Sequence, residues 1–434
     1  MNKIHIDTVG EAKIPSPLCS SKSSTFVGDD CIVYNTHSSE LEKEEKKNGI
    51  TFFEIAGPKD KIHFDPPKIS CGIVTCGGLC PGLNDVIQSI VSELSERYGV
   101  RRILGFKYGY LGITKDSIEE PLNLTVENVD GLHRLGGTVL GSSRGPRDTK
   151  DIVQTLKKNK INILFIIGGD GTMRGAKEIN EEIKNQNLGI SIIALPKTID
   201  NDLNYVKMSF GFQTAVEKAM SVISCAHVEA SGAPNCIGLV KLMGRHSGYI
   251  AAHATLANRD VNYCLIPEVP FKLEGSGGLL NSLEKRLDRK GHAVVVVAEG
   301  AGQYLMENNS YLEQRDKSGN LKLRDIGLYL KGTIPEYFKN KGRNINLKYI
   351  DPSYIIRGVP ANAIDSTYCL ELGQNAVHAA MSGKTNMMIG YWNHHFINVP
   401  IEMAIKSRNR VDPNGRLWKT VMEATLQPDS IFDV

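Results

Sequence analysis

The sequence predicts an α/β protein made of two doubly wound domains with mainly parallel sheets. From Lys68 onward, short apolar runs rich in β-branched residues alternate with longer amphipathic stretches, which is the pattern of repeated β-α-β units. The length of 434 residues exceeds what one ordinary hydrophobic core supports, so we expect two domains. Ligands bind beyond the carboxyl ends of the strands in such sheets, and several glycine-rich or acidic loops follow the apolar runs.

Seven apolar runs predict the strands, and amphipathic stretches between them predict helices, for example at 211–230 and 363–381. The predicted strands cover residues 70–75, 161–167, 190–195, 235–240, 261–266, 293–298 and 386–391. Residues 1–68 are more polar and include the charge run ELEKEEKK at 40–47. Because both signs of charge alternate there, we interpret the run as a solvated helix face within an N-terminal extension.

Composition excludes several functional classes. A formal net charge of +3 gives no basic footprint for nucleic acid, and no apolar run approaches the roughly 18 residues of a membrane span. We expect neither partner and, since the N-terminus has no apolar signal core, a cytoplasmic location. The nine cysteines are odd in number, and Cys71, Cys76 and Cys80 lack zinc-site spacing, which favours reduced thiols over disulfides or metal ligands.

The first chemically informative loop is CGGLCPGLN at 76–84. Gly77 and Gly78 let a ligand approach the backbone, and Pro81 suits the start of a helix whose amides would face an anion. A phosphate cradle and a simple tight turn both fit. The loop lacks the G-x-G-x-x-G fingerprint, which disfavours a Rossmann dehydrogenase.

The second loop is GGDGTMRG at 168–175. Its four glycines permit close approach, and Asp170 could hold Mg²⁺ that neutralises a polyphosphate. The alternative is that Asp170 accepts backbone N–H bonds within its own turn.

The third loop is PKTIDNDL at 196–203. Asp200 and Asp202 can divide their roles, one accepting a proton from an attacking hydroxyl and the other helping to organise a metal, with Thr198 nearby. An Asx-turn without chemistry is the alternative.

Eight motifs in a fixed order resemble the 6-phosphofructokinases over residues 69 to about 410: GGLCPG, GSSRGPR, GGDGT, PKTIDND, GFQTAVEKA, KLMGRHSG, VAEGAG and YIIRGVPANAIDS. NAD kinases and lipid kinases are similar only at GGDGT. The resemblance implies transfer of a terminal phosphoryl group to the 1-hydroxyl of fructose 6-phosphate, giving fructose 1,6-bisphosphate.

The resemblance also implies roles for the loop residues. Asp200 resembles the catalytic base, assisted by Thr198, and Asp170 resembles the acid associated with Mg²⁺, supported by Asp202. Arg144 resembles the guanidinium that balances charge on the transferred phosphoryl group; a surface arginine is the alternative. The implied ATP-binding residues are Gly77, Gly78, Arg144, Gly169, Asp170, Gly171, Thr172 and Gly175.

The implied sugar-phosphate residues are Thr198, Asp200, Met243, Gly244, Arg245, Glu299, Lys348, Tyr354 and Arg357. Glu299 suits a sugar hydroxyl because a carboxylate can only accept from it, and the cations suit the 6-phosphate. A helix cap for Glu299, a solvated side chain for Lys348 and a packing role for Met243 are the alternatives.

Two positions bear on the phosphoryl donor. Users of pyrophosphate usually carry Asp at the position of Gly171, where a carboxylate would repel the α-phosphate of ATP, but they also carry lysine at the position of Lys197. The absence of the repulsive acid favours ATP. A pyrophosphate-dependent enzyme and a non-catalytic regulatory subunit are the alternatives.

Two departures from bacterial relatives limit the comparison. Cys236 stands where they have a phosphate-binding arginine, and we hypothesise that Lys197 takes over the charge at the transition state. The helix segment PGLNDVIQSIV lacks their basic residues, so their effector site is doubtful here.

The resemblance implies that the two domains face each other across a cleft. Residues 69–205 and 384–417 are then assigned to the nucleotide-binding domain, and residues 206–383 and 418–434 to the sugar-phosphate-binding domain. Members assemble as homotetramers, so Lys348 or Arg245 would act in a neighbouring subunit's site.

Overall fold

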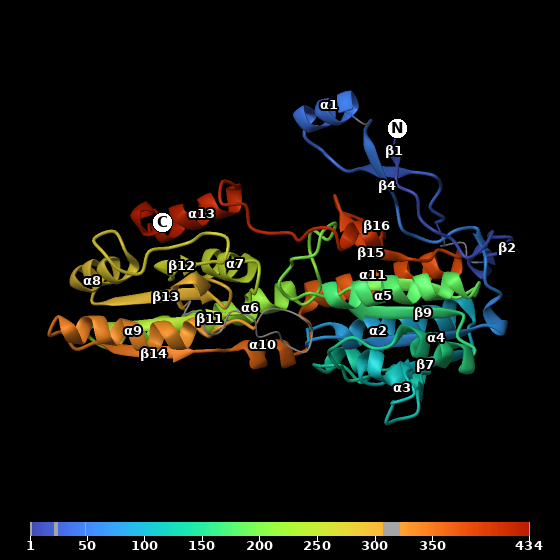
Figure 1. Ribbon diagram of the computed structural model, residues 1–434, viewed down its shortest axis with the longest axis horizontal. Helices are drawn as coiled ribbons and strands as arrows, with labels where there is room; N and C mark the ends of the chain where they lie inside the picture. The colour runs from blue at the N-terminus through green and yellow to red at the C-terminus, as the bar shows by residue number, and fades with distance from the viewer. Residues whose placement is uncertain (1, 21–24, 48, 307–321, 434) are drawn as a thin grey trace. The chain divides into compact units, whose positions relative to one another are not determined.

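The computed structural model describes residues 2–20, 25–47, 49–306 and 322–433 (Figure 1). The chain forms two compact units. The first contains residues 1–199, 203–211 and 358–408, and the second contains residues 200–202, 212–357 and 409–434. The α/β architecture with mainly parallel sheets is confirmed, because each unit is built around its own sheet.

The first unit contains a seven-stranded sheet. In spatial order its strands are β16 (His395–Pro400), β15 (Met387–Trp392), β10 (Ser191–Pro196), β9 (Ile163–Gly168), β6 (Ser70–Thr75), β7 (Arg102–Phe106) and β8 (Leu122–Asn123). Neighbours are parallel except at the two edges, where β16 and β8 are antiparallel. Every residue of β6, β9 and β10 is buried, which explains why their sequences are continuous apolar runs.

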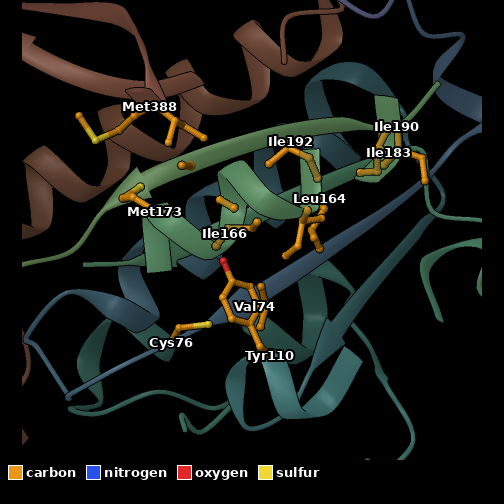
Figure 2. Close-up of a cluster of buried hydrophobic side chains, with 14 of the residues drawn as sticks. Val74, Cys76, Tyr110, Leu164, Ile166, Met173, Ile183, Ile190, Ile192 and Met388 are labelled. Carbon is orange, nitrogen blue, oxygen red and sulfur yellow. The ribbon is translucent and has the colours of Figure 1, made fainter. Parts of the chain in front are cut away.

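Helices pack along this sheet. They are α2 (Leu83–Ser92), α3 (Val126–Val129), α4 (Thr149–Lys158), α5 (Asp170–Asn185), α11 (Ala363–Met381) and α12 (Ile401–Ala404). Helix α2 packs on α11, and α4 packs on α5. Figure 2 shows the core between α5 and the sheet, where Leu164 and Ile166 from β9 meet Met173 and Ile183 from α5.

The second unit contains a four-stranded, fully parallel sheet. Its order is β12 (Tyr263–Leu265), β13 (His292–Ala298), β11 (Cys236–Leu242) and β14 (Asn346–Ile350). Its helices are α6 (Phe212–Ser231), α7 (Tyr249–Asn258), α8 (Leu279–Lys290), α9 (Ile326–Asn340), α10 (Ser353–Gly358), which ends at the unit boundary, and α13 (Arg416–Thr425). Helices α8 and α9 bury their leucine faces with β11 and β13 in a separate hydrophobic core.

The predicted extension is part of the first unit rather than a polar appendage. Strands β1 (Asn2–Lys3), β4 (Thr51–Glu54) and β3 (Cys31–Val33) form one small sheet, and β2 (Ile14–Pro15) pairs with β5 (Lys61–Ile62). Phe53 is fully buried in the same hydrophobic core as Ile166, and Ile55 forms a bridge with Ile397 on β16. Only the charge run matches the prediction, because α1 (Ser38–Lys47) has no buried residue.

The compact units differ from the predicted domains at four ranges: residues 200–202 lie in the second unit, residues 206–211 lie in the first, and two longer segments also exchange units. Residues 358–383 were assigned to the second domain, but α11 belongs to the first unit because it packs on α2 and β10. Residues 409–417 were assigned to the first domain, but they belong to the second unit, where Val411 N–H donates to Glu268 at 2.8 Å.

Each of the seven predicted strands is present. Strand β6 has the predicted bounds, and the ends of the others are shifted by at most two residues. All nine cysteines are free thiols. Within the described ranges, every helix is either too short or too polar to cross a lipid bilayer.

A substitution can test whether the extension stabilises the first unit. Replacing Phe53 with Ala should lower the free energy of unfolding by about 3–5 kcal/mol, because a large side chain is deleted from a closed core. Glu45→Ala, on the solvated face of α1, is the control and should change it by less than about 0.5 kcal/mol. Urea denaturation measures both. Equal midpoints for the two variants would mean that the extension folds apart from the core.

Candidate functional site

Three loops meet at one edge of the first unit's sheet. They follow β6, β9 and β10, which are parallel neighbours, so their carboxyl ends lie together. The backbone N–H of Lys197 donates to Gly168 at 2.9 Å, and its ammonium donates to the carbonyl of Gly78 at 2.7 Å. Lys197 is buried. This one residue therefore links all three loops.

The first glycine loop is also tied to the motif GSSRG. Gly77 N–H donates to the Ser143 carbonyl at 3.1 Å, and the Ser142 hydroxyl donates back to the Gly77 carbonyl at 2.5 Å. Gly77 has φ 85°, and a Cβ there would lie 3.3 Å from the Lys197 ammonium, so glycine is required. Arg144 follows directly and is exposed.

The glycines around Asp170 have different surroundings. A Cβ on Gly171 would meet no described atom within 4 Å, so the space beside the first turn of α5 is open. A Cβ on Gly175 would lie 2.7 Å from the ring of Tyr110, and one on Gly168 would lie 2.4 Å from Thr172. Gly171 thus leaves room for a ligand, whereas packing within the protein accounts for Gly168 and Gly175.

Asp170 is the first residue of α5, whose N-terminal amides favour anions. Its carboxylate pairs with Arg408 at 2.9 Å and with Arg174, one turn along the helix, at 3.3 Å. The sequence analysis missed Arg408. It lies far along the chain in a loop without a recognisable motif, so only the fold reveals it.

The third loop carries a strained residue between its two acids. Asn201 is buried and has φ 56°, which is uncommon for a residue other than glycine. The carbonyl of Asp202 accepts from Asn409 N–H at 2.9 Å. Thr198 and Lys197 belong to the first unit, while Asp200, Asn201 and Asp202 belong to the second. The loop is therefore one of the places where the chain passes between units.

The second unit holds Asp200 at both its backbone and its carboxylate. The Ser247 hydroxyl donates to the Asp200 carbonyl at 2.8 Å, and Arg245 N–H donates to Oδ2 at 3.4 Å. The other carboxylate oxygen, Oδ1, is buried and has no hydrogen-bond partner among the described residues. A buried acceptor without a partner is costly, so its presence points to a ligand that donates to it.

The motifs KLMGR and AEG form one structure beside this carboxylate. Gly300 N–H donates to the Gly244 carbonyl at 3.1 Å, and a Cβ on Gly300 would lie only 2.0 Å from the Arg245 carbonyl. Gly244 has φ 125°, and Met243 is fully buried, which supports its packing role. Glu299 continues from β13, where its N–H donates to the Leu242 carbonyl at 2.9 Å.

The surroundings of Asp200 raise the pKa of its carboxyl from 3.8 to about 7. Burial is the main cause, and the charges of Asp202 and Glu299 add to it. Arg357 and the Arg245 N–H act in the opposite direction. A carboxylate with a pKa near neutrality can accept a proton from an alcohol and release it again, which is the property of a general base.

Two predicted residues lie apart from this cluster in the described contacts. Lys348 is on strand β14 and pairs with Glu229 at 3.6 Å, and Tyr354 on α10 is 88% exposed. Arg357, on the same helix as Tyr354, has a buried Nε without a described hydrogen-bond partner. Arg357 acts on Asp200 through its charge and Arg245 contacts it through the backbone N–H, whereas the described ion pair of Lys348 is with Glu229.

The profile of the family described as Phosphofructokinase matches residues 70–380. The chain belongs to this family. It is 50% identical to an ATP-dependent 6-phosphofructokinase of Borreliella burgdorferi, covering 98% of this chain and 97% of that one. It is 45% identical to an ATP-dependent 6-phosphofructokinase of Amycolatopsis methanolica, covering 99% and 95%.

The fold is similar to a solved phosphofructokinase structure as well. The pyrophosphate-dependent phosphofructokinase from Marinobacter aquaeolei matches with a TM-score of 0.66 and 18% identity, over 84% of this chain and 91% of that chain. At this identity the similarity bears on the fold alone. It supports the phosphofructokinase architecture without bearing on the phosphoryl donor.

The residues at the first turn of α5 fit one kind of metal binding. Among the described residues, no group of three or more histidine, cysteine or acidic side chains is arranged as a metal cage. Asp170 instead offers a single, partly exposed carboxylate next to the open space at Gly171. This suits Mg²⁺ that arrives with phosphates and keeps most of its other ligands.

The raised pKa of Asp200 predicts a pH-dependent effect on stability. Between pH 4 and 7 the folded protein binds a proton that the unfolded chain releases, so ionisation of Asp200 destabilises the fold as the pH rises through this window. Asp200→Asn should therefore raise the free energy of unfolding, little at pH 4 and most above about pH 7. Urea denaturation between pH 4 and 8 measures the difference. A difference independent of pH would show that the carboxyl has an ordinary pKa.

Proposed function

We propose that the protein is an ATP-dependent 6-phosphofructokinase. It transfers the γ-phosphoryl group of ATP to the 1-hydroxyl of fructose 6-phosphate, giving fructose 1,6-bisphosphate and ADP. The observation that carries this proposal is the Asp200 carboxylate, whose pKa is about 7 and whose Oδ1 lacks a described hydrogen-bond partner. Relatives that are 45–50% identical and bear this name support the same conclusion.

Asp200 acts as the general base. Its Oδ1 accepts the proton of the sugar 1-hydroxyl as the oxygen attacks phosphorus, while Arg245 N–H holds Oδ2 in place. Near neutral pH a substantial fraction of the carboxyl is ionised and ready to accept. The hydrogen bond from the Ser247 hydroxyl to the Asp200 carbonyl helps to fix the direction of the Asp200 side chain. This matters because a proton is transferred only over hydrogen-bond distance. Thr198 lies two residues away on the same loop and assists at the acceptor hydroxyl.

Two cations of the first unit balance the charge that develops on the phosphoryl group. Arg144 follows Ser142 and Ser143, whose hydrogen bonds fix the loop, and its exposed guanidinium is available to a ligand. The ammonium of Lys197 lies at the first glycine loop, where it donates to the Gly78 carbonyl. We assign to it the stabilisation of transition-state charge, because Cys236 stands where bacterial relatives have an arginine. Preorganised cations stabilise such charge without reorganising.

ATP binds along the carboxyl edge of the first unit's sheet. Gly78, Gly169, Gly171 and Thr172 are assigned to the phosphates through their backbone, and the N-terminus of α5 supplies positive potential. Gly77 is assigned to the same site for the close approach that its turn allows, because its own N–H and carbonyl are bonded to Ser143 and Ser142. Asp170 holds Mg²⁺, with Asp202 in support, and the metal supplies neutralisation of the phosphate charge when it is bound. Gly175 belongs to the same predicted set and lies where the Tyr110 ring leaves no room for a Cβ.

The assignment of ATP as donor rests on Gly171. A carboxylate at this position would project into the open space beside α5 and repel a nucleotide phosphate. Here that space is unobstructed, and the relatives at 45–50% identity are named ATP-dependent. Pyrophosphate dependence is the second candidate, because Lys197 is a residue that pyrophosphate users usually carry.

Fructose 6-phosphate is recognised by the cluster around Asp200 in the second unit. Glu299 accepts from a sugar hydroxyl, Met243 and Gly244 shape the loop, and Arg245 and Arg357 bind the 6-phosphate. Because Lys348 and Tyr354 lie apart from this cluster, we assign them to the site of a neighbouring subunit in a homotetramer. A cytoplasmic location fits a protein with nine free thiols.

A coupled assay tests this function and its donor. The purified chain should phosphorylate fructose 6-phosphate at least tenfold faster with MgATP than with pyrophosphate. Asp200→Asn should reduce kcat by at least about a hundredfold, because the base is lost while the geometry is kept. A tenfold preference for pyrophosphate would reverse the donor assignment. Absence of turnover with either donor would instead favour a non-catalytic regulatory subunit.

A glycine pair tests the sugar-phosphate assignment. Gly300→Ala forces a methyl group against the Arg245 carbonyl and should raise KM for fructose 6-phosphate at least tenfold, with a smaller change in KM for ATP. Gly332→Ala, on the exposed side of α9 where a Cβ meets no described atom, is the control and should leave both constants within twofold. If Gly300→Ala raised only KM for ATP, the loop would belong to the nucleotide site instead.

A further inference from the structure

Arg408 occupies a position that its local sequence does not explain. It lies between α12 and α13, and its guanidinium contacts Asp170 Oδ2 at 2.9 Å with 27% of the side chain exposed. Its backbone forms an antiparallel bridge with Leu203, directly after the two acids of the third loop. The side chain thus reaches the second loop while the backbone is attached to the third.

The backbone contacts hold this segment in place without help from the guanidinium. Beside the bridge at Leu203, Asn409 N–H donates to the Asp202 carbonyl, and the Asn204 amide contacts the Ser407 hydroxyl. These contacts already fix the segment to the third loop. The guanidinium of Arg408 is not needed for that and instead contacts Asp170, the acid of the second loop.

Arg174 provides an internal comparison, because it contacts the same carboxylate. It lies one turn further along α5 and is 57% exposed, about twice as exposed as Arg408. An exposed pair of this kind within one helix is weak and screened by solvent. Arg408 comes from a separate segment at the first turn of the helix, where phosphates are expected to bind.

We propose that Arg408 is a phosphate-binding arginine of the nucleotide site. In the free protein its guanidinium forms an ion pair with the Asp170 carboxylate. When nucleotide binds, the guanidinium donates to the β- and γ-phosphates instead. This inference rests on the proposed function, because it requires the α5 turn to be the ATP site.

The chemistry of the two groups supports this exchange. A guanidinium presents several N–H donors in a fixed plane that matches the oxygens of a phosphate as well as those of a carboxylate. MgATP remains an anion, so a cation beside the phosphates still stabilises it. Because the backbone of Arg408 is attached next to Asp202, the same residue also connects phosphate binding to the loop of the catalytic base.

Calorimetric titration of the full chain tests the proposal with three probes: the Mg²⁺ complex of a non-hydrolysable ATP analogue, AMP, and fructose 6-phosphate. Arg408→Ala should weaken binding of the ATP analogue about 10- to 100-fold, the size expected for a lost charge-assisted contact. AMP, which lacks the β- and γ-phosphates, and fructose 6-phosphate should bind within threefold of the wild type. Arg174→Ala is the matched control and should bind all three probes within threefold.

Arg408→Lys keeps the positive charge and is used alongside in case the alanine variant does not fold; it should bind the ATP analogue with intermediate affinity. The proposal is overturned if Arg408→Ala binds the ATP analogue like the wild type, or if both variants lose affinity for all three probes in parallel, which would indicate a structural role. If the wild type binds no nucleotide at all, the proposed function fails rather than the role of Arg408.

Discussion

The parallel pairing of β6, β9 and β10 is the constraint on which the rest of the site depends. Register places Thr75 beside Ile167 and Gly168 beside Pro196, so three loops start at the same level of the sheet. Lys197 continues this ladder by one further backbone hydrogen bond, to Gly168. Its side chain then donates to the Gly78 carbonyl of the first loop. Loops that are distant in sequence acquire a common geometry because the strands below them cannot slip without exposing wholly buried residues.

The two acids Asp170 and Asp200, which lie in different loops of the site, have opposite electrostatic surroundings. Asp170 lies at a helix N-terminus and pairs with two guanidiniums, those of Arg174 and Arg408. Asp200 is crowded by Asp202 and Glu299 and is removed from water, which favours its protonated form. One acid is suited to hold cations and the other to exchange protons. The fold separates these two tasks through the neighbouring charges and the burial of each carboxylate.

Much of the fold was predictable because the central strands carry a strong signal. Residues 70–75 are a buried strand with the predicted bounds. Strands β7 and β14 were missed: β14 is half-buried with the sequence NLKYI, and β7 contains a glycine and an exposed arginine, so neither shows a continuous apolar run. Helix α11 was predicted with its true ends, but its unit depends on packing against α2, which periodicity does not encode.

The site was predictable where residues lie in glycine-rich or acidic motifs after strands, as with Asp170 and Asp200. Arg408 and Ser247 were not predicted, because each contacts its aspartate through the tertiary fold rather than through sequence spacing. Arg408 contacts the Asp170 carboxylate, and Ser247 contacts the Asp200 carbonyl. Gly175 remains a prediction. The Tyr110 ring explains why no larger residue fits there, but this packing does not test a backbone contact to a ligand.

The bridge between Ile55 and Ile397 has a consequence for the sheet as a whole. Strand β16 is the last strand of the sheet, and the Ala56 N–H donates to its Phe396 carbonyl at 2.8 Å, so the N-terminal segment covers part of an otherwise open row of backbone groups. Uncovered strand edges invite pairing with other chains and aggregation. The segment that precedes the family-matched region thus occupies backbone groups of β16 through which another strand could otherwise pair.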